Sequence, residues 1–180
     1  MDKPRIPPVI SQSHKLLKAA EDTMRKQCAL LNAAAAKDVI DADQMIGHLD
    51  LFIRLICLDL ASVDSRIAEE EARLLNALFQ QNWPAEQYAA LQYDIRNEHP
   101  DIISKEMGAR LLACNIMAAQ LTGEPYDPDT DWLLKTVAAI GKIVIGIDRQ
   151  TTPGEKARMD DILRKIHDEA HSLLASLSPR

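Results

Sequence analysis

Two groups of acidic residues in this sequence have the same internal spacing. Glu71 follows Asp64 by seven residues, and Glu155 follows Asp148 by seven residues; each residue of the second group lies 84 positions after its counterpart in the first. Glu70 stands directly beside Glu71. Carboxylate oxygens are ligands that suit the hard cations calcium, magnesium and manganese rather than zinc or copper. If folding gathers these side chains, they could bind a divalent cation.

The same carboxylates also fit a purely structural role. An aspartate at a helix end can accept backbone N–H bonds from the turn, and a glutamate in the first turn of a helix can cap it and interact with its dipole. The sequence Thr152-Pro153-Gly154-Glu155 is a capping box with proline at the first helical position. Capping accounts for every one of these acidic residues, so both interpretations stay open.

The helices that position these residues are predicted from the spacing of apolar side chains. Apolar residues recur every three or four positions up to Val63 and again up to Ile147, and a second helix is expected after each turn, from near Glu69 and from Pro153 to about Leu174. The offset of 84 carries the apolar positions of the first pair onto those of the second: Leu49, Ile53, Ile56, Leu60, Leu75, Leu78 and Phe79 onto Leu133, Val137, Ile140, Val144, Met159, Ile162 and Leu163. The chain is predicted to contain a duplicated helical hairpin.

The remaining segments are also predicted to be helical. After a proline-rich tail over residues 1–10, expected to be disordered, Ser11 or Ser13 can cap a helix to about residue 36. A further helix from about residue 101 to 121 should turn inward the residues Ile103, Met107, Leu111, Cys114, Ala118 and Leu121. It is followed by a polar loop over residues 122–131, with Asp129 or Thr130 as the cap of the next helix. No strand pattern appears. We therefore expect an all-α single domain of about seven helices, with an N-terminal helix in residues 11–40 and the repeated hairpins in residues 41–180.

Composition narrows the classes of function. The 180 residues carry a net charge of −6 and 47% hydrophobic residues with few aromatics, which is typical of a globular, helix-on-helix protein. No basic stripe of a nucleic-acid binder, no apolar run of a signal peptide and no segment able to span a membrane is visible, so a cytoplasmic protein is expected. The three cysteines, Cys28, Cys57 and Cys114, lie near apolar stripes and are expected to be buried thiols.

Motifs of known chemistry are missing. The loop that begins at Asp127 alternates aspartates like a calcium-binding EF-hand, but its sixth position is Trp132 and its twelfth is Ala138, where glycine and glutamate are needed. His167 and His171 share a helical face without the glutamate of a zinc protease motif. There is no phosphate-binding loop, dinucleotide fingerprint or nucleophile elbow.

Two of the turns resemble those of a known family. Asp64-Ser65-Arg66-Ile67-Ala68-Glu69-Glu70-Glu71 after one apolar helix, and Asp148 to Glu155 after another, resemble the repeated motif of the TerB-like family, named for the tellurite-resistance protein B. The resemblance covers roughly residues 49–174. It departs from the family at the glycine that usually follows the aspartate, which is Ser65 in one copy and Arg149 in the other.

The resemblance implies both a fold and a function. It implies two hairpins that face each other about a pseudo-two-fold axis, so that Asp64, Glu70 or Glu71, Asp148 and Glu155 form a site for a divalent cation. It also implies a non-enzymatic bacterial stress-response protein, linked to tellurite, chemical or phage stress, that acts through protein partners at the inner membrane surface. Two alternatives remain: a helical adaptor domain without a bound ion, and an enzyme with an acidic metal centre.

Overall fold

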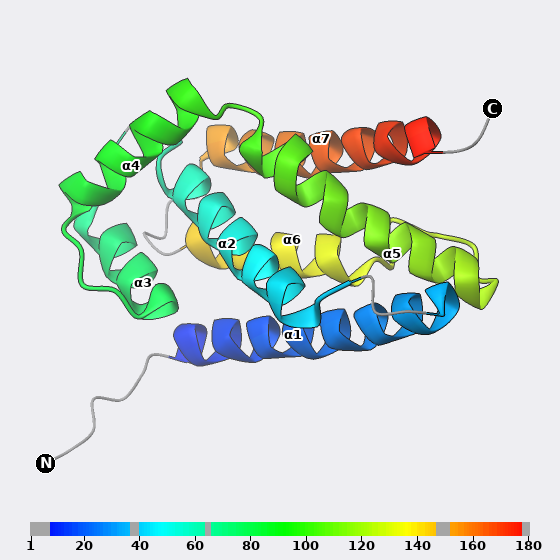
Figure 1. Cartoon of the computed structure of the whole chain (residues 1–180). Coiled ribbons are helices and arrows are strands. Elements are labelled where there is room, and N and C mark those ends of the chain that lie inside the picture. Colours follow the sequence, from blue (N-terminus) through cyan, green and yellow to red (C-terminus); the bar gives the residue numbers. More distant parts are fainter. Residues whose placement is uncertain (1–7, 37–39, 64–65, 147–151, 178–180) are drawn as a thin grey trace, which may run out of the picture.

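The computed structural model describes residues 8–36, 40–63, 66–146 and 152–177, and within them all regular structure is helical. The helices are α1 (Pro8–Ala35), α2 (Ala42–Ala61), α3 (Glu69–Phe79), α4 (Ala85–Glu98), the π-helix η1 (Ile102–Gly108), which continues directly into α5 (Ala109–Thr122), α6 (Trp132–Val144) and α7 (Pro153–Leu177) (Figure 1). The predicted all-α single domain is confirmed, with no strand in the part of the chain that is described. Most of the proline-rich tail, residues 1–7, lies outside these ranges.

Helix α2 is the centre of the molecule. It packs against α1, α6 and η1, and also contacts α3, α4 and α7. Its second half, from Leu55 to Ala61, is buried on every side, whereas its first turns have an exposed face. Water does not reach a helix that is buried on all sides, so any polar side chain on it must find its hydrogen-bond partners within the protein. Asp59 is the charged residue in this buried segment.

The two hairpins follow the predicted repeat. Helices α3 and α7 begin at Glu69 and Pro153, which are 84 positions apart, and α2 packs against α6. The equivalent apolar residues Leu49 and Leu133, Ile53 and Val137, Ile56 and Ile140, Leu60 and Val144, Leu75 and Met159, and Leu78 and Ile162 are all buried. The starts of the first helices do not match, since α2 begins at Ala42 and α6 at Trp132. The duplication is therefore seen around the two turns and not over the whole hairpin.

The helix before the second hairpin differs from the expectation. Its first seven residues form a π-helix, in which the Glu106 N–H donates to the Asp101 carbonyl oxygen five residues before it. A wider turn rotates the side chains that follow it about the helix axis. The buried residues of α5 are consequently Ala109, Leu111, Leu112, Ala113, Asn115, Ile116 and Ala118, while Met107 and Cys114 are only partly buried and Leu121 is exposed. The prediction that Leu121 points inward was wrong.

The thiols follow the burial of their helices. Cys28 and Cys57 are buried, as expected, while Cys114 is only partly so; all three are free. Burial raises the pKa of the Cys57 thiol to about 12 and that of Cys114 to about 11. Raised values of this kind mark thiols that act as small apolar side chains rather than as nucleophiles.

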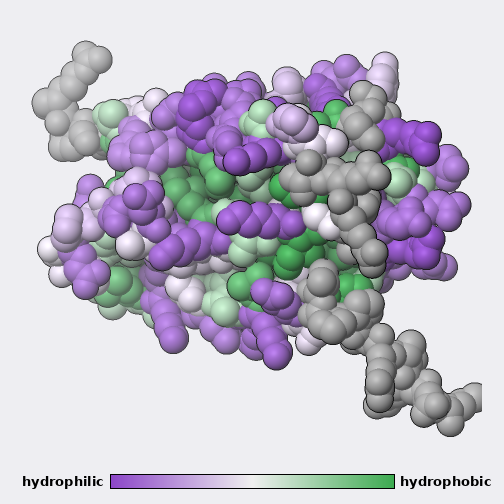
Figure 2. All heavy atoms as spheres, turned by 180° about the vertical axis from the view of Figure 1, so that it is seen from behind, coloured by the Kyte–Doolittle hydropathy of each residue, from purple (hydrophilic) through white to green (hydrophobic). Residues whose placement is uncertain are grey.

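The surface is mixed rather than uniformly polar. Seen from the side on which α6 lies, which passes behind α2 in Figure 1, hydrophobic side chains show through between areas of hydrophilic ones (Figure 2). Helix α6 contributes the half-buried Leu134 and Ile143 in addition to its buried face. Within the described ranges, no helix combines the length and the apolar character that crossing a bilayer requires.

Candidate functional site

The glutamates of the two acidic turns both act as helix caps. The Ala68 N–H donates to Glu71 Oε2 at 2.7 Å, and the Thr152 N–H donates to Glu155 Oε2 at 2.6 Å. In the second turn the Glu155 N–H also donates to Thr152 Oγ1 at 3.2 Å, which completes the predicted capping box. Glu71 and Glu155 are buried to nearly the same extent. Glu71 and Glu155 thus cap the starts of α3 and α7 in the same way.

The remaining candidates for a cation site are placed less closely or not at all. Glu70 is exposed and pairs with Arg73 at 3.3 Å. Asp64 and Asp148 lie outside the described residues. Val63, just past the end of α2, and Gly154, at the start of α7, nevertheless adjoin, because a Cβ added at Gly154 would lie 3.6 Å from Val63 Cγ1. Among the residues with a described position, no three His, Cys, Asp or Glu side chains are grouped so as to hold a metal ion.

The loop before α6 has a capping role, but not through the residues expected. Asp131, rather than Asp129 or Thr130, is the N-cap of α6, and its Oδ1 accepts from the Leu134 N–H at 3.0 Å. Asp131 is buried and also accepts from Asn115 Nδ2 at 2.9 Å. His167 and His171 share a face of α7, with ring centroids 4.4 Å apart, and the His171 ring packs against Tyr126.

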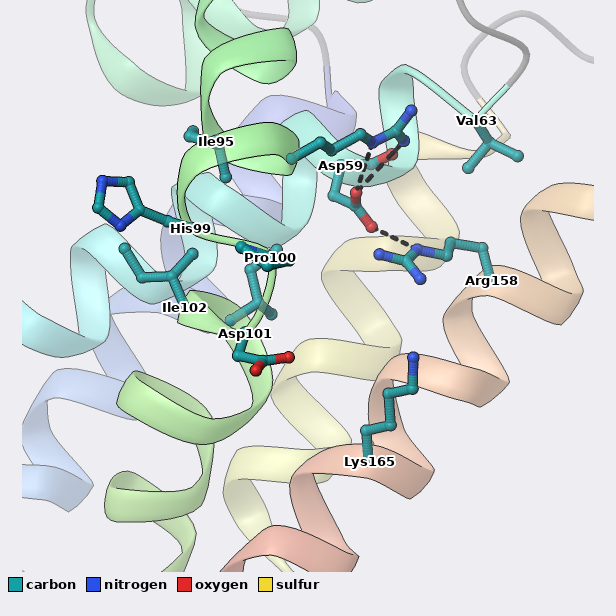
Figure 3. A pocket seen from close by; sticks show the side chains of 11 residues that line it. Asp59, Val63, Ile95, His99, Pro100, Asp101, Ile102, Arg158 and Lys165 are labelled. Atoms are coloured by element: carbon teal, nitrogen blue, oxygen red, sulfur yellow. Dashed lines mark hydrogen bonds and ion pairs between the residues drawn. The ribbon is translucent and has the colours of Figure 1, made fainter.

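A network around Asp59 connects three helices. Asp59 lies near the end of α2 with its side chain only 2% exposed. Its Oδ2 accepts a hydrogen bond from Arg158 Nε of α7 at 2.6 Å (Figure 3). Its Oδ1 accepts from Gln92 Nε2 of α4 at 2.9 Å and from Arg96 Nη2, also of α4, at 3.3 Å. Both oxygens of this carboxylate are therefore engaged.

The arginines are fixed by more than Asp59. Arg96 Nη2 also donates to Ser62 Oγ at 3.2 Å, at the end of α2. Arg158 pairs with Asp161 one turn further along α7, at 3.4 Å. Burial disfavours the charge of Arg158, but the hydrogen bond to Asp59 and the two neighbouring carboxylates outweigh that effect and raise its pKa above the usual value. Two cationic groups are thus held in fixed positions, and Arg158 stays charged.

These residues border a cavity of about 490 Å³ between α2, α4, η1 and α7. Its lining residues are Asp59, Val63, Ile95, Arg96, His99, Pro100, Asp101, Ile102, Ile103, Arg158 and Lys165. In Figure 3, the Arg158 side chain extends from α7 toward Asp59, and the Lys165 side chain points along α7 toward Arg158. Pro100 and Asp101, where the chain enters the π-helix, lie across the pocket from both. π-Helical turns occur frequently at functional sites. We refer to this cavity as the Asp59 pocket.

The arrangement favours recognition of an anion. Among the described residues, Arg96 Nη1 and Arg158 Nη2 have no hydrogen-bond partner, and the Lys165 ammonium group pairs only with Asp161, at 3.0 Å. Guanidinium groups present their N–H donors in a plane that matches a carboxylate or phosphate. Asp59 itself has no free oxygen for acid-base chemistry, because the guanidinium groups and Gln92 occupy both. The unpaired N–H groups of Arg96 and Arg158 are therefore suited to bind an anionic group in the pocket.

Sequence reasoning missed this network. The available signal was a single aspartate within the apolar run from Leu55 to Leu60, since a charge on a buried helix requires a partner. The partners themselves could not be deduced, because Arg96 and Arg158 lie 37 and 99 residues away from Asp59 along the chain. Asp59 also has no counterpart in the repeat, where Ile143 occupies the equivalent position.

Comparison of the chain with protein-family models, with curated proteins and with solved structures gives no match.

Proposed function

We propose that this protein is a non-enzymatic binding protein whose Asp59 pocket recognises a carboxylate or phosphate group of its partner. The observation that carries the proposal is a buried carboxylate that holds two arginines from different helices at the wall of a 490 Å³ cavity. Asp59 fixes the position of the guanidinium groups, and the half-exposed Lys165 adds a third donor to the pocket. A preorganised set of donors binds an anion without the entropic cost of ordering the side chains.

Titration with inorganic phosphate tests this proposal. We expect saturable changes in the NMR amide resonances of residues around the pocket, such as Ile102 and Ile103. Replacing Lys165 with Gln removes one exposed cation from the rim and should weaken phosphate binding by about three- to tenfold, since a hydrogen bond to a charged group is worth about 1 kcal/mol or more at a partly exposed site.

The matched control is Lys156→Gln. Lys156 is also an exposed lysine of α7, but it does not line the pocket, so this variant has the same change of net charge. It should leave phosphate affinity unchanged. Equal weakening by both variants would show that phosphate senses only the overall charge, and an absence of saturation would refute the anion site.

A second candidate is the divalent-cation site of the TerB-like interpretation, with a role in bacterial stress response. The observation in its favour is the contact between Val63, which precedes Asp64 in the chain, and Gly154, which precedes Glu155. On this proposal Asp64, Glu70 or Glu71, Asp148 and Glu155 would supply oxygen ligands to calcium, magnesium or manganese. The capping bond of Glu155 counts against it only in part, because that bond uses a single carboxylate oxygen, Oε2.

Thermal melting with millimolar manganese or calcium separates this candidate from an ion-free adaptor. A cation that binds the folded state alone must raise the melting temperature. The variant Glu155→Gln retains an oxygen able to accept the Thr152 N–H, since glutamine also serves in a capping box. It should therefore melt normally without metal and lose the metal-dependent increase. No increase in the wild-type protein would remove the cation site, and a melting temperature lowered to the same extent with and without metal would make Glu155 a cap only.

A further inference from the structure

A second hollow adjoins the Asp59 pocket at Arg96. Its volume is about 320 Å³, and it lies between the end of α2, the segment that leads into α3 and helix α4. Asp59 and Ser62 both accept hydrogen bonds from the Arg96 guanidinium group, but Asp59 lines only the Asp59 pocket and Ser62 lines only the second hollow. The guanidinium group therefore forms the partition between the two. We refer to the second hollow as the Tyr93 pocket.

The Tyr93 pocket is positively charged. Arg66 and Arg96 line it, and none of the described residues that line it is acidic. Arg66 is exposed and the Arg96 side chain is 41% exposed, so a ligand can reach both from solvent. Glu69 and Glu70, which follow Arg66 closely in the chain, pair with Arg73 and do not line the pocket. An anionic group would thus be attracted to this hollow as well as to the Asp59 pocket.

The Tyr93 pocket also has an apolar part. The buried Ile67 and Ala89 line it together with Tyr93. Tyr93 is 70% exposed, more than any other large hydrophobic residue of the described chain. Tyrosine and arginine are enriched among the residues that carry most of the binding energy of protein–protein interfaces. An exposed ring next to two arginines is therefore suited to an apolar side chain of a partner whose neighbouring groups are anionic.

Together the two hollows carry more positive than negative charge. Among the described residues that line them, the cationic side chains are those of Arg66, Arg96, Arg158 and Lys165. The acidic ones are Asp59 and Asp101, and both oxygens of Asp59 are already engaged within the protein. A single small anion would occupy the Asp59 pocket alone and leave the apolar part of the Tyr93 pocket uncovered. A ligand that fits both hollows must carry an anionic and an apolar group close together.

We propose that the Asp59 and Tyr93 pockets together bind an extended acidic segment of a partner protein. One carboxylate of the segment lies beside Arg158 and Lys165, and an apolar side chain two positions away packs on Tyr93 and Ile67, because alternate residues of an extended chain project to the same side. This inference rests on the anion site proposed above and adds the chemistry of the partner to it. A nucleic acid is disfavoured, since its charged backbone would continue along a protein whose net charge is −6.

The test is an NMR titration of the ¹⁵N-labelled full chain with the blocked peptide acetyl-Ser-Glu-Ser-Leu-Ser-Glu-Ser-amide. We expect saturable shifts of the amide resonances of Ile102 and Ile103, at the Asp59 pocket, and of Ile67 and Ala89, at the Tyr93 pocket. A peptide with serine in place of leucine should bind about three- to tenfold more weakly and lose the shifts at the Tyr93 pocket. A peptide with glutamine in place of both glutamates should not saturate.

Two variants with matched controls test the Tyr93 pocket itself. Tyr93→Ala should weaken binding of the leucine peptide about three- to tenfold, because the leucine loses its contact with the ring. Leu91→Ala is its control, since Leu91 is also exposed on α4 but lines neither pocket. Arg66→Gln should weaken binding about two- to fivefold, as for an exposed ion pair. Arg73→Gln removes another exposed arginine, which lines neither pocket, and should have no effect.

The phosphate titration distinguishes failure of this inference from failure of the anion site. If phosphate saturates but the peptide shifts only Ile102 and Ile103 and binds equally well without its leucine, the acidic-segment proposal is wrong and the anion site stands. If neither phosphate nor the peptide saturates, both proposals are refuted. Equal effects of a variant and its control would also overturn the acidic segment. Tighter binding of the thymidine trinucleotide, which has the same charge as the peptide, would assign the surface to a nucleic-acid backbone instead.

Discussion

Asp59 illustrates why a buried charge is retained on the central helix α2. The removal of a carboxylate from water costs several kcal/mol, and a buried ion pair seldom stabilises a fold more than apolar side chains of the same size would. Asp59 is therefore poorly explained by stability alone. It does give two arginines and a glutamine from α4 and α7 one fixed geometry at the wall of a cavity. The Asp59 carboxylate therefore serves to position the side chains of Gln92, Arg96 and Arg158.

Removal of its charge should be costly. Asp59→Asn leaves Arg96 and Arg158 without their common anion, although both guanidinium groups are partly exposed and can recruit water. We expect a loss of about 2–4 kcal/mol in the free energy of unfolding, measured with urea. Asp50→Asn on the same helix is the control, because Asp50 pairs with Arg54 at a partly exposed position; it should cost about 0.5 kcal/mol at most. Equal effects of the two substitutions would contradict the role given to Asp59.

The π-helix η1 shows how packing between helices can replace regular α-helical hydrogen bonding. It lies against α2, α5 and α7, and its last residue is Gly108. A Cβ at Gly108 would lie 2.7 Å from the Ile103 carbonyl oxygen and from Ile166 Cγ1, and 2.9 Å from Phe52 Cε2. Only glycine allows this approach between three helices, and the start of the same segment lines the Asp59 pocket.

Gly108→Ala should accordingly destabilise the protein. Ile103 contributes a backbone atom and Phe52 a buried ring, so neither can move aside easily. We expect a loss of about 1–3 kcal/mol on urea unfolding, as for other overpacked sites. Gly47→Ala in α2 meets nothing within 4 Å and should raise stability by about 0.5–1 kcal/mol, because alanine restricts the unfolded chain. A stabilising effect at Gly108 would show that the helices can separate without cost.

The molecule as a whole is held together by contacts between distant segments. Helix α1 packs on α2, α5 and α6, and α7 packs on α5, η1 and α6, so neither hairpin has a core of its own. Fragments 1–99 and 100–180 should each lack stable helical structure in circular dichroism when expressed alone. The full chain should unfold in a single transition, with circular dichroism and tryptophan fluorescence coinciding. Cooperative unfolding of either fragment alone would disprove this interdependence.

The helices and their caps could be predicted from the sequence because they depend on interactions between residues close together in the chain. Apolar spacing of three and four predicted the buried faces of α2 and α6, and the capping box predicted the start of α7 at Pro153. The repeat placed Glu71 and Glu155 at equivalent positions, and in the structure both cap the start of a helix and are buried to nearly the same extent. The inward face of α5 was predicted only in part: Leu111 and Ala118 are buried as expected, but Leu121 is exposed. The π-helical turn before α5 depends on the close packing around Gly108, which the residue pattern does not encode.

What the sequence determined by itself is therefore an all-α chain with a duplicated turn, since hydrogen bonds three to five residues apart and apolar periodicity act over short distances. Only the tertiary structure brought Arg158 to Asp59 across 99 residues, and Arg66 and Ile67 to the face of α4 that carries Tyr93. Neither pocket has a short motif, because each is built from side chains of several helices and connecting segments, whose packing depends on the whole core. The pockets of this protein accordingly lie where several helices meet.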